Sequence, residues 1–176
     1  MNSNEAEWKE INCLSSRIML RIPKQLIEQS YEKIEKRFPY DSKPQEVRMD
    51  EDGNIILTLN LLEKQLEEGQ LTSATEEVQR MITRIYPESM RSYVRYMKTE
   101  AGMAGWFSFI TGGVADDNCH IMFLMSVSGK MMLGSYHFPV GHEQEEKENF
   151  FNILRSMQVI QPEKIHGESR AHGSRI

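Results

Sequence analysis

The sequence is 176 residues long, 39% hydrophobic and 27% charged, with a formal net charge of -5. This length and apolar content predict one domain with a single core, and the acidic balance argues against nucleic-acid or anionic-membrane binding. The longest apolar run, Ile121–Met125, is far shorter than the roughly 18 residues of a membrane span.

Cysteine usage and the N-terminus bear on the cellular compartment. Cys13 and Cys119 belong to no CxxC pair, which gives no support to structural zinc or thioredoxin-like chemistry. The polar N-terminus shows no signal-peptide pattern, so we expect a cytoplasmic protein with two free thiols. We expect residues 1–16 to be a polar N-terminal segment that is loosely held over residues 1–12, residues 17–160 to form one domain, and residues 161–176 to be a disordered tail.

The first half of the domain alternates between strand and helix patterns. Apolar alternation predicts a strand over residues 18–23, and helical spacing predicts an amphipathic helix over residues 26–38. Asp52-Gly53 predicts a tight turn between two strands, residues 46–50 and 54–60. Residues 61–68 fit either a short helix or an irregular excursion.

The second half is dominated by strands. Ser73-Ala74-Thr75-Glu76 matches a capping box and predicts a helix that ends near Ile85, before Pro87. Its expected inner stripe is Val78, Met81, Ile82 and Ile85. The apolar period then changes to two, which predicts strands over residues 91–99, 103–110, 119–127 and 130–138. A last amphipathic helix starts at Glu143, where early glutamates suit the helix dipole.

The most informative pattern is a hairpin around Ser128-Gly129. A two-residue turn there pairs Val127 with Lys130 and places Phe123 opposite Gly134, where an aromatic ring can cover the missing side chain. Both faces of this ribbon are then apolar along the middle, which is expected for a central strand pair covered on both sides. The sequence therefore predicts an α+β fold, an antiparallel sheet of six to seven strands with helices on both faces.

The same register sets two histidines side by side. His120 lies opposite His137, with His142 shortly after and Asp116 and Asp117 before the strand. These residue types can bind zinc or another divalent ion, whereas the simpler interpretation is a hydrogen-bonded or hydrated histidine pair. A small-molecule or metal-dependent enzyme using His120 and His137 is the alternative function, although no standard catalytic motif occurs and no cofactor is implied.

Three features are candidates for partner binding. Arg91 and Arg95 belong to the stretch Arg80–Lys98, which contains five Arg and Lys residues and one acidic residue, Glu88. This basic stretch is either a solvated surface or a site for an acidic partner. The Gly- and Asp-rich loop over residues 111–118 is a second candidate. Trp106 is expected either in the core beneath a helix or as an exposed anchor for a partner.

A set of short segments resembles the PsbP/DcrB-like superfamily. They are Arg21-Ile22-Pro23, Gly105-Trp106-Phe107-Ser108-Phe109, Gly129-Lys130, Leu133-Gly134-Ser135-Tyr136 and the closing helix. The resemblance spans residues 17–160. It implies a non-enzymatic binding or assembly module on an antiparallel sheet, as in a photosystem extrinsic subunit, bacterial lipoproteins and a Ran-binding nuclear factor. It assigns no catalytic residues, and the chain shows no lipoprotein signal or lipid-bearing cysteine. We therefore expect an unidentified protein partner, with a homodimer as a further possibility.

Overall fold

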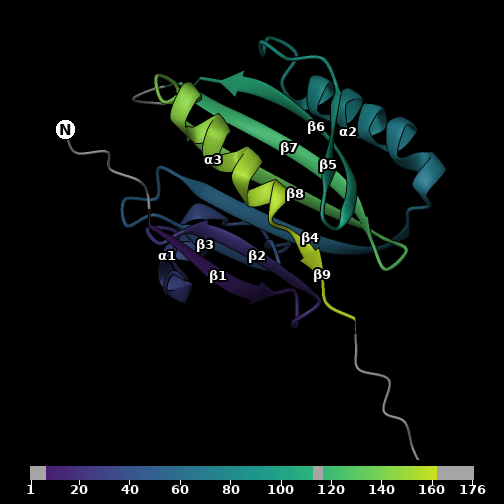
Figure 1. The fold of residues 1–176 in the computed structure, drawn as a ribbon. Coiled ribbons are helices and arrows are strands. Elements are labelled where there is room, and N and C mark those ends of the chain that lie inside the picture. The colour runs from purple at the N-terminus through teal and green to yellow at the C-terminus, as the bar shows by residue number, and fades with distance from the viewer. Residues whose placement is uncertain (1–6, 113–116, 162–176) are drawn as a thin grey trace, which may run out of the picture.

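The computed structural model describes residues 7–112 and 117–161 and has two sheets and three helices (Figure 1). The strands are β1 (Trp8–Cys13), β2 (Ile18–Pro23), β3 (Glu46–Met49), β4 (Ile56–Gln65), β5 (Arg95–Thr99), β6 (Gly102–Thr111), β7 (Asn118–Val127), β8 (Lys130–Pro139) and β9 (Gln158–Val159). The helices are α1 (Tyr31–Arg37), α2 (Leu71–Ile85) and α3 (Glu143–Arg155). The expected α+β class is confirmed.

The larger sheet is antiparallel and has the strand order β3-β4-β8-β7-β6-β5. Its six strands agree with the expected size. Strand β2 lies outside it, in a second sheet of order β1-β2-β9. Strand β1 was not expected, because Trp8–Cys13 alternates polar and apolar residues too weakly to stand out; it pairs with β2 along its whole length. The prediction that this part of the N-terminal segment is loosely held was therefore wrong.

The central hairpin has the predicted register. Val127 pairs with Lys130, and Phe123 pairs with Gly134. Both turn residues have positive φ, 51° at Ser128 and 80° at Gly129, as a type I′ turn requires. A Cβ atom at Gly134 would overlap the Phe123 ring, so the aromatic side chain occupies the space that glycine leaves open.

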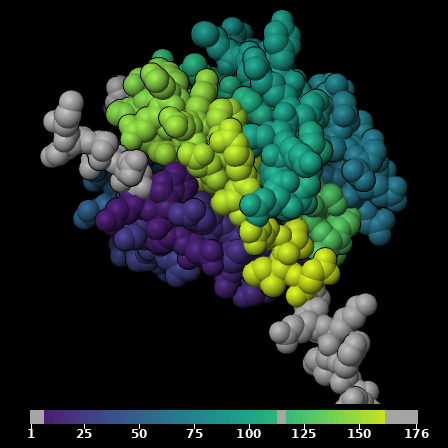
Figure 2. All heavy atoms as spheres, viewed as in Figure 1, coloured from purple at the N-terminus to yellow at the C-terminus, as the bar shows by residue number. Residues whose placement is uncertain are grey.

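One face of the large sheet is covered by α3 and the small sheet. Its side chains include Ile121, Phe123, Tyr136 and Phe138, all at most 1% exposed, and Phe150 of α3 packs onto them. The atoms of α3 lie between those of the N-terminal sheet and those of β5 and β6 (Figure 2). This face holds the main hydrophobic core.

The opposite face is divided between α1 and α2. Ile34 and Phe38 cover the outer strands β3 and β4, while Leu71 and Ala74 cover β7 and β8. Helices therefore lie on both faces of the large sheet, as expected. Between the two helices the face is only half-buried, as at Met122.

Helix α1 is shorter than its apolar spacing suggests. It begins at Tyr31 after the cap Ser30, whose side chain accepts a hydrogen bond from the Lys33 amide. The preceding Ile27 exchanges two backbone hydrogen bonds with Met49, so this segment is extended. The helical prediction for residues 26–30 was wrong because pairing with the edge of β3 replaces the first helical turn.

Helix α2 also starts earlier than predicted. The capping box is formed by Glu67 and Gln70 around a short 3-10 turn, not by residues 73–76. Residues 61–65 continue strand β4, so both expected alternatives, a short helix and an irregular excursion, are wrong for that part of the segment. The buried residues of α2 lie in its first half, whereas Met81 and Ile85 of the expected inner stripe are exposed. Among the described residues, no helix has the length and hydropathy needed to cross a membrane.

Candidate functional site

Exposed apolar side chains gather around the end of α2 and the start of β5. Tyr93 is 87% exposed and Met90 is 74% exposed. We call this region the 81–96 surface, defined by the exposed side chains Met81, Ile85, Tyr86, Met90, Arg91, Tyr93, Arg95 and Tyr96. An exposed apolar patch is a common mark of an interaction site, and this stretch of chain contains six large exposed apolar side chains.

The chain between α2 and β5 is fixed by hydrogen bonds to both neighbours. The Gln79 side chain of α2 donates to the Ser92 carbonyl at 2.8 Å, and the Ser92 amide donates to the Ser108 carbonyl of β6 at 2.8 Å. Arg91 pairs with Phe109 and Arg95 with Trp106, so this segment holds one more residue than the facing stretch of β6. Such an extra residue makes a bulge, which explains how Tyr93 projects from an otherwise ordered edge.

The two arginines of this surface lack carboxylate partners. Arg91 donates to the backbone carbonyls of Tyr86 and Pro87 at 3.3 and 3.4 Å. Within the described part of the chain, neither Arg91 nor Arg95 makes an ion pair with Asp or Glu. Both arginines are exposed, and β5, which begins at Arg95, is an edge strand, so both guanidinium groups are accessible to an acidic ligand.

The other residues expected to bind a partner are placed differently. Trp106 is only 9% exposed and packs edge-on against Phe150 and Phe151, so it belongs to the core and is not an exposed anchor. Asp117 is exposed, and its carbonyl accepts a hydrogen bond from Val140. Asp116 lies outside the described residues.

His120 and His137 are the centre of a second polar cluster. Their Nδ1 atoms are 3.1 Å apart, as the predicted register requires. The Nε2 atom of His137 lies 3.3 Å from a guanidinium nitrogen of Arg37, and the Nε2 atom of His120 lies 2.7 Å from the Thr111 hydroxyl. The His120 ring also stacks on Phe109 at 4.8 Å between ring centroids. All four ring nitrogens therefore have partners.

Arg37 fixes the direction of this chain of hydrogen bonds. A guanidinium group only donates, so Nε2 of His137 accepts from Arg37 and the His137 proton sits on Nδ1. That proton is donated to Nδ1 of His120, which leaves the His120 proton on Nε2, where it is donated to Thr111. The geometry thus assigns one tautomer to each imidazole.

Both imidazoles are held in the neutral form. Burial, with the positive charge of Arg37, lowers the pKa of His120 to about 4. Burial, then the neighbouring His120 and Arg37, lower the pKa of His137 to about 3. Each ring nitrogen of the two neutral imidazoles already has a hydrogen-bond partner, so a metal ion or a substrate would have to displace one of these partners.

The structure does not bring the expected metal ligands together. His142 is exposed at the start of α3, apart from the hydrogen-bonded pair. No group of three or more His, Cys, Asp or Glu side chains is positioned to hold a metal ion within residues 7–112 and 117–161. The interpretation that fits the observed contacts is the hydrogen-bonded histidine pair.

Sequence analysis missed Arg37 and the exposed tyrosines. Arg37 lies 100 residues before His137, so local spacing gives no indication of their contact. Met90 had a usable signal, because it lies between Pro87 and the strand predicted over residues 91–99, outside both periodic patterns. Tyr93 had none, because it falls within that predicted strand. Large apolar residues outside any periodic pattern are candidates for exposure.

Comparison with known proteins identifies the fold. No protein-family model and no curated protein matches the sequence. The Ran-binding protein Mog1p of Saccharomyces cerevisiae superimposes with a TM-score of 0.59 at 12% identity, over 89% of this chain and 97% of that one. Cyanobacterial PsbP (CyanoP) of Synechocystis gives 0.59 at 8% identity, over 91% and 96%. LpqN of Mycobacterium tuberculosis, involved in cell envelope biogenesis, gives 0.52 at 11% identity, over 90% and 93%. The chain thus has the fold of the PsbP and Mog1 proteins, as the resemblance predicts.

Proposed function

We propose that this protein is a non-enzymatic binding module that recognises an acidic segment of a protein partner at the 81–96 surface. The observation that carries the proposal is the exposure of Tyr93 and Met90 beside two arginines without carboxylate partners. Tyr, Met and Arg are enriched at protein interfaces, and Tyr and Arg dominate binding energy where they meet a partner.

Charge supports the choice of an acidic partner. The protein carries a net charge of -5, yet the stretch Arg80–Lys98 is basic, so the rest of the chain is strongly acidic. Such an uneven distribution attracts an acidic segment to the basic region and repels it from the remaining surface. The exposed aromatic and Met side chains would then supply apolar contact area at the same place.

The comparisons support a binding role at a general level. Mog1p is described as Ran-binding, and LpqN is described as involved in cell envelope biogenesis. We also propose a cytoplasmic location. Its support is that Cys13 and Cys119 are both free thiols, which is usual in reducing compartments, where disulfides are rare.

Selection from a display library of random 15-residue peptides tests the proposal. We expect selected peptides to combine Asp or Glu with apolar residues. The double variant Arg91→Glu/Arg95→Glu and the single variant Tyr93→Ala should each bind a selected peptide at least about tenfold more weakly. The matched control Arg17→Glu/Arg21→Glu makes the same change in charge at two exposed positions, one in the turn between β1 and β2 and one in β2, and should bind like the wild type.

Three outcomes would overturn the proposal. They are selection of basic peptides, equal binding by the Arg91/Arg95 variant, and failure of any peptide to be enriched over a column without protein. Light scattering at several concentrations tests whether a second copy of the chain binds this surface instead. A wild-type dimer that Tyr93→Ala dissociates would show that it does.

A further inference from the structure

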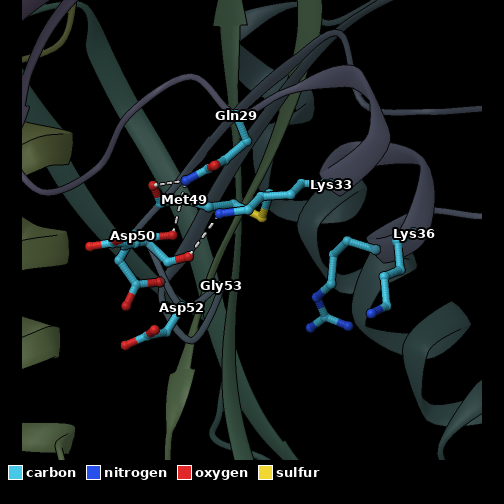
Figure 3. A pocket seen from close by; sticks show the side chains of 9 residues that line it. Gln29, Lys33, Lys36, Met49, Asp50, Asp52 and Gly53 are labelled. Carbon is cyan, nitrogen blue, oxygen red and sulfur yellow. Dashed lines mark hydrogen bonds between the residues drawn. The ribbon is translucent and has the colours of Figure 1, made fainter.

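A cavity of about 340 Å³ lies between α1 and the turn that joins β3 to β4. One wall carries the cationic side chains of α1, and the facing wall carries the carboxylates of the turn. Figure 3 shows Lys36 on the α1 side and Asp50 and Asp52 on the turn side, while Lys33 of α1 reaches across to the turn. Arg37 completes the cationic wall. The cavity is therefore lined by opposite charges on opposite sides.

Hydrogen bonds hold the two walls in place. The Gln29 amide donates to the carbonyls of Met49 and Asp50 at 3.3 and 3.1 Å, and the Lys33 ammonium donates to the Glu51 carbonyl at 3.2 Å. One carboxylate oxygen of Asp50 accepts from the Ile55 amide at 2.9 Å, which shapes the turn. These hydrogen bonds set the distance between the two walls. They do not involve the charged groups of Lys36 or Asp52.

Arg37 is held in a defined position without a counter-ion. Its contact with the neutral imidazole of His137 uses one guanidinium nitrogen and leaves other N–H groups available. Within the part of the chain that the structure describes, neither Arg37 nor Lys36 comes within 4 Å of a carboxylate oxygen. Cationic and anionic side chains therefore line the same cavity, and Arg37 and Lys36 form no ion pair with the carboxylates of the turn.

We infer that this cavity binds a small zwitterion, with a carboxylate at Arg37 and Lys36 and an ammonium group at Asp50 and Asp52. A simple anion would be attracted by α1 but repelled by the turn, and a simple cation would meet the reverse situation. A molecule with both charges satisfies both walls together. A pre-positioned arginine favours a carboxylate through paired hydrogen bonds, and Met49 offers an apolar contact for the carbon chain between the charges.

Titration of the full chain followed by NMR tests this inference. The probes are 4-aminobutyrate, with glycine and 6-aminohexanoate as shorter and longer zwitterions, and butyrate and butylamine as matched single ions. At least one zwitterion should give saturable shifts at α1 and at the β3–β4 turn in the millimolar range. Butyrate and butylamine should bind at least about tenfold more weakly.

Variants locate the binding. Arg37→Gln, Lys36→Gln and Asp52→Asn should each weaken binding of the best zwitterion by at least about threefold. Lys24→Gln, which removes an exposed cation paired with Glu7, should leave the affinity unchanged. Lys36 and Asp52 are exposed, so these two variants keep the test valid if Arg37→Gln fails to fold. Arg91→Glu/Arg95→Glu should not alter zwitterion binding, which separates this site from the 81–96 surface.

The inference is wrong if no zwitterion gives saturable shifts at these positions. It is also wrong if butyrate or butylamine binds as tightly as the zwitterions. Binding that is unchanged in both Lys36→Gln and Asp52→Asn would likewise contradict it.

Discussion

The two faces of the six-stranded sheet differ in how completely they are covered and in where polar side chains lie. On the α3 face, a continuous apolar layer contains side chains with almost no exposure, such as Phe123 and Tyr136. On the other face, α1 and α2 cover separate parts and leave a strip between them in which His120 is half-buried and its neighbour His137 is buried. The divided face is therefore the one where polar side chains reach a cavity and where a neutral histidine pair can be accommodated.

The difference shows how one fold separates stability from recognition. A continuous core tolerates little change, because every side chain in it contacts several others. The side chains of the divided face and of the 81–96 surface make fewer and more polar contacts. Substituting them should therefore lower the free energy of unfolding less than substitutions in the continuous core. The following predictions test this contrast, beginning with the largest expected effect.

Removal of an aromatic ring from the continuous face should be the most destabilising change. Phe150→Ala leaves a cavity among Trp106, Phe123 and Tyr136 and should lower the free energy of unfolding by about 3 to 5 kcal/mol. Met122→Ala, at a half-buried position on the divided face, should cost about 1 kcal/mol. Urea unfolding of both variants measures the difference, and equal losses would show that the two faces contribute alike.

The second prediction concerns the close contact across the hairpin. Gly134→Ala places a methyl group where the Phe123 ring lies, and the strain should cost about 1 to 3 kcal/mol in urea unfolding. Gly69→Ala is a suitable control because a Cβ atom there has no neighbour within 4 Å and φ is not positive. A neutral effect of Gly134→Ala would mean that Phe123 does not cover this position.

The third prediction concerns pH and the histidine pair. The folded pKa values of His120 and His137 lie below the value near 6.5 expected after unfolding, so the unfolded chain binds more protons below that pH. Stability is therefore complete above about pH 6.5 and decreases as pH falls towards the folded pKa values. We expect the free energy of unfolding to be about 2 kcal/mol or more lower at pH 5 than at pH 7.

Two variants separate this effect from the titration of other groups. His120→Asn should reduce the change in stability between pH 7 and pH 5 by about half, because one of the two shifted groups is removed. His142→Asn, at an exposed position, should leave the change as it is in the wild type. A pH dependence that is unaltered by His120→Asn would show that the pair is not the cause.

The sequence predicts those parts of the fold that depend on local patterns. The hairpin register followed from one turn and a period of two, and it placed His120 opposite His137 correctly. The start of α1 was wrong because Ile27 pairs with Met49, more than 20 residues away, and such pairing overrides helical spacing.

The candidate sites were less predictable for the same physical reason. Arg91 and Arg95 were identified from charge alone, and the structure adds the exposed side chains around them. Arg37 was not found, because its role depends on a contact between α1 and β8 that no local pattern encodes. Trp106 was ambiguous from the sequence, since alternation assigns a face but not what covers it.

Hydrogen–deuterium exchange of the wild-type chain with a selected acidic peptide is the most direct measurement of the central claim. We predict slower exchange at backbone amides of residues 86–98 in the complex and unchanged exchange in α1 and the β3–β4 turn. Protection confined to α1 and that turn, or to the small sheet, would show that the partner binds elsewhere.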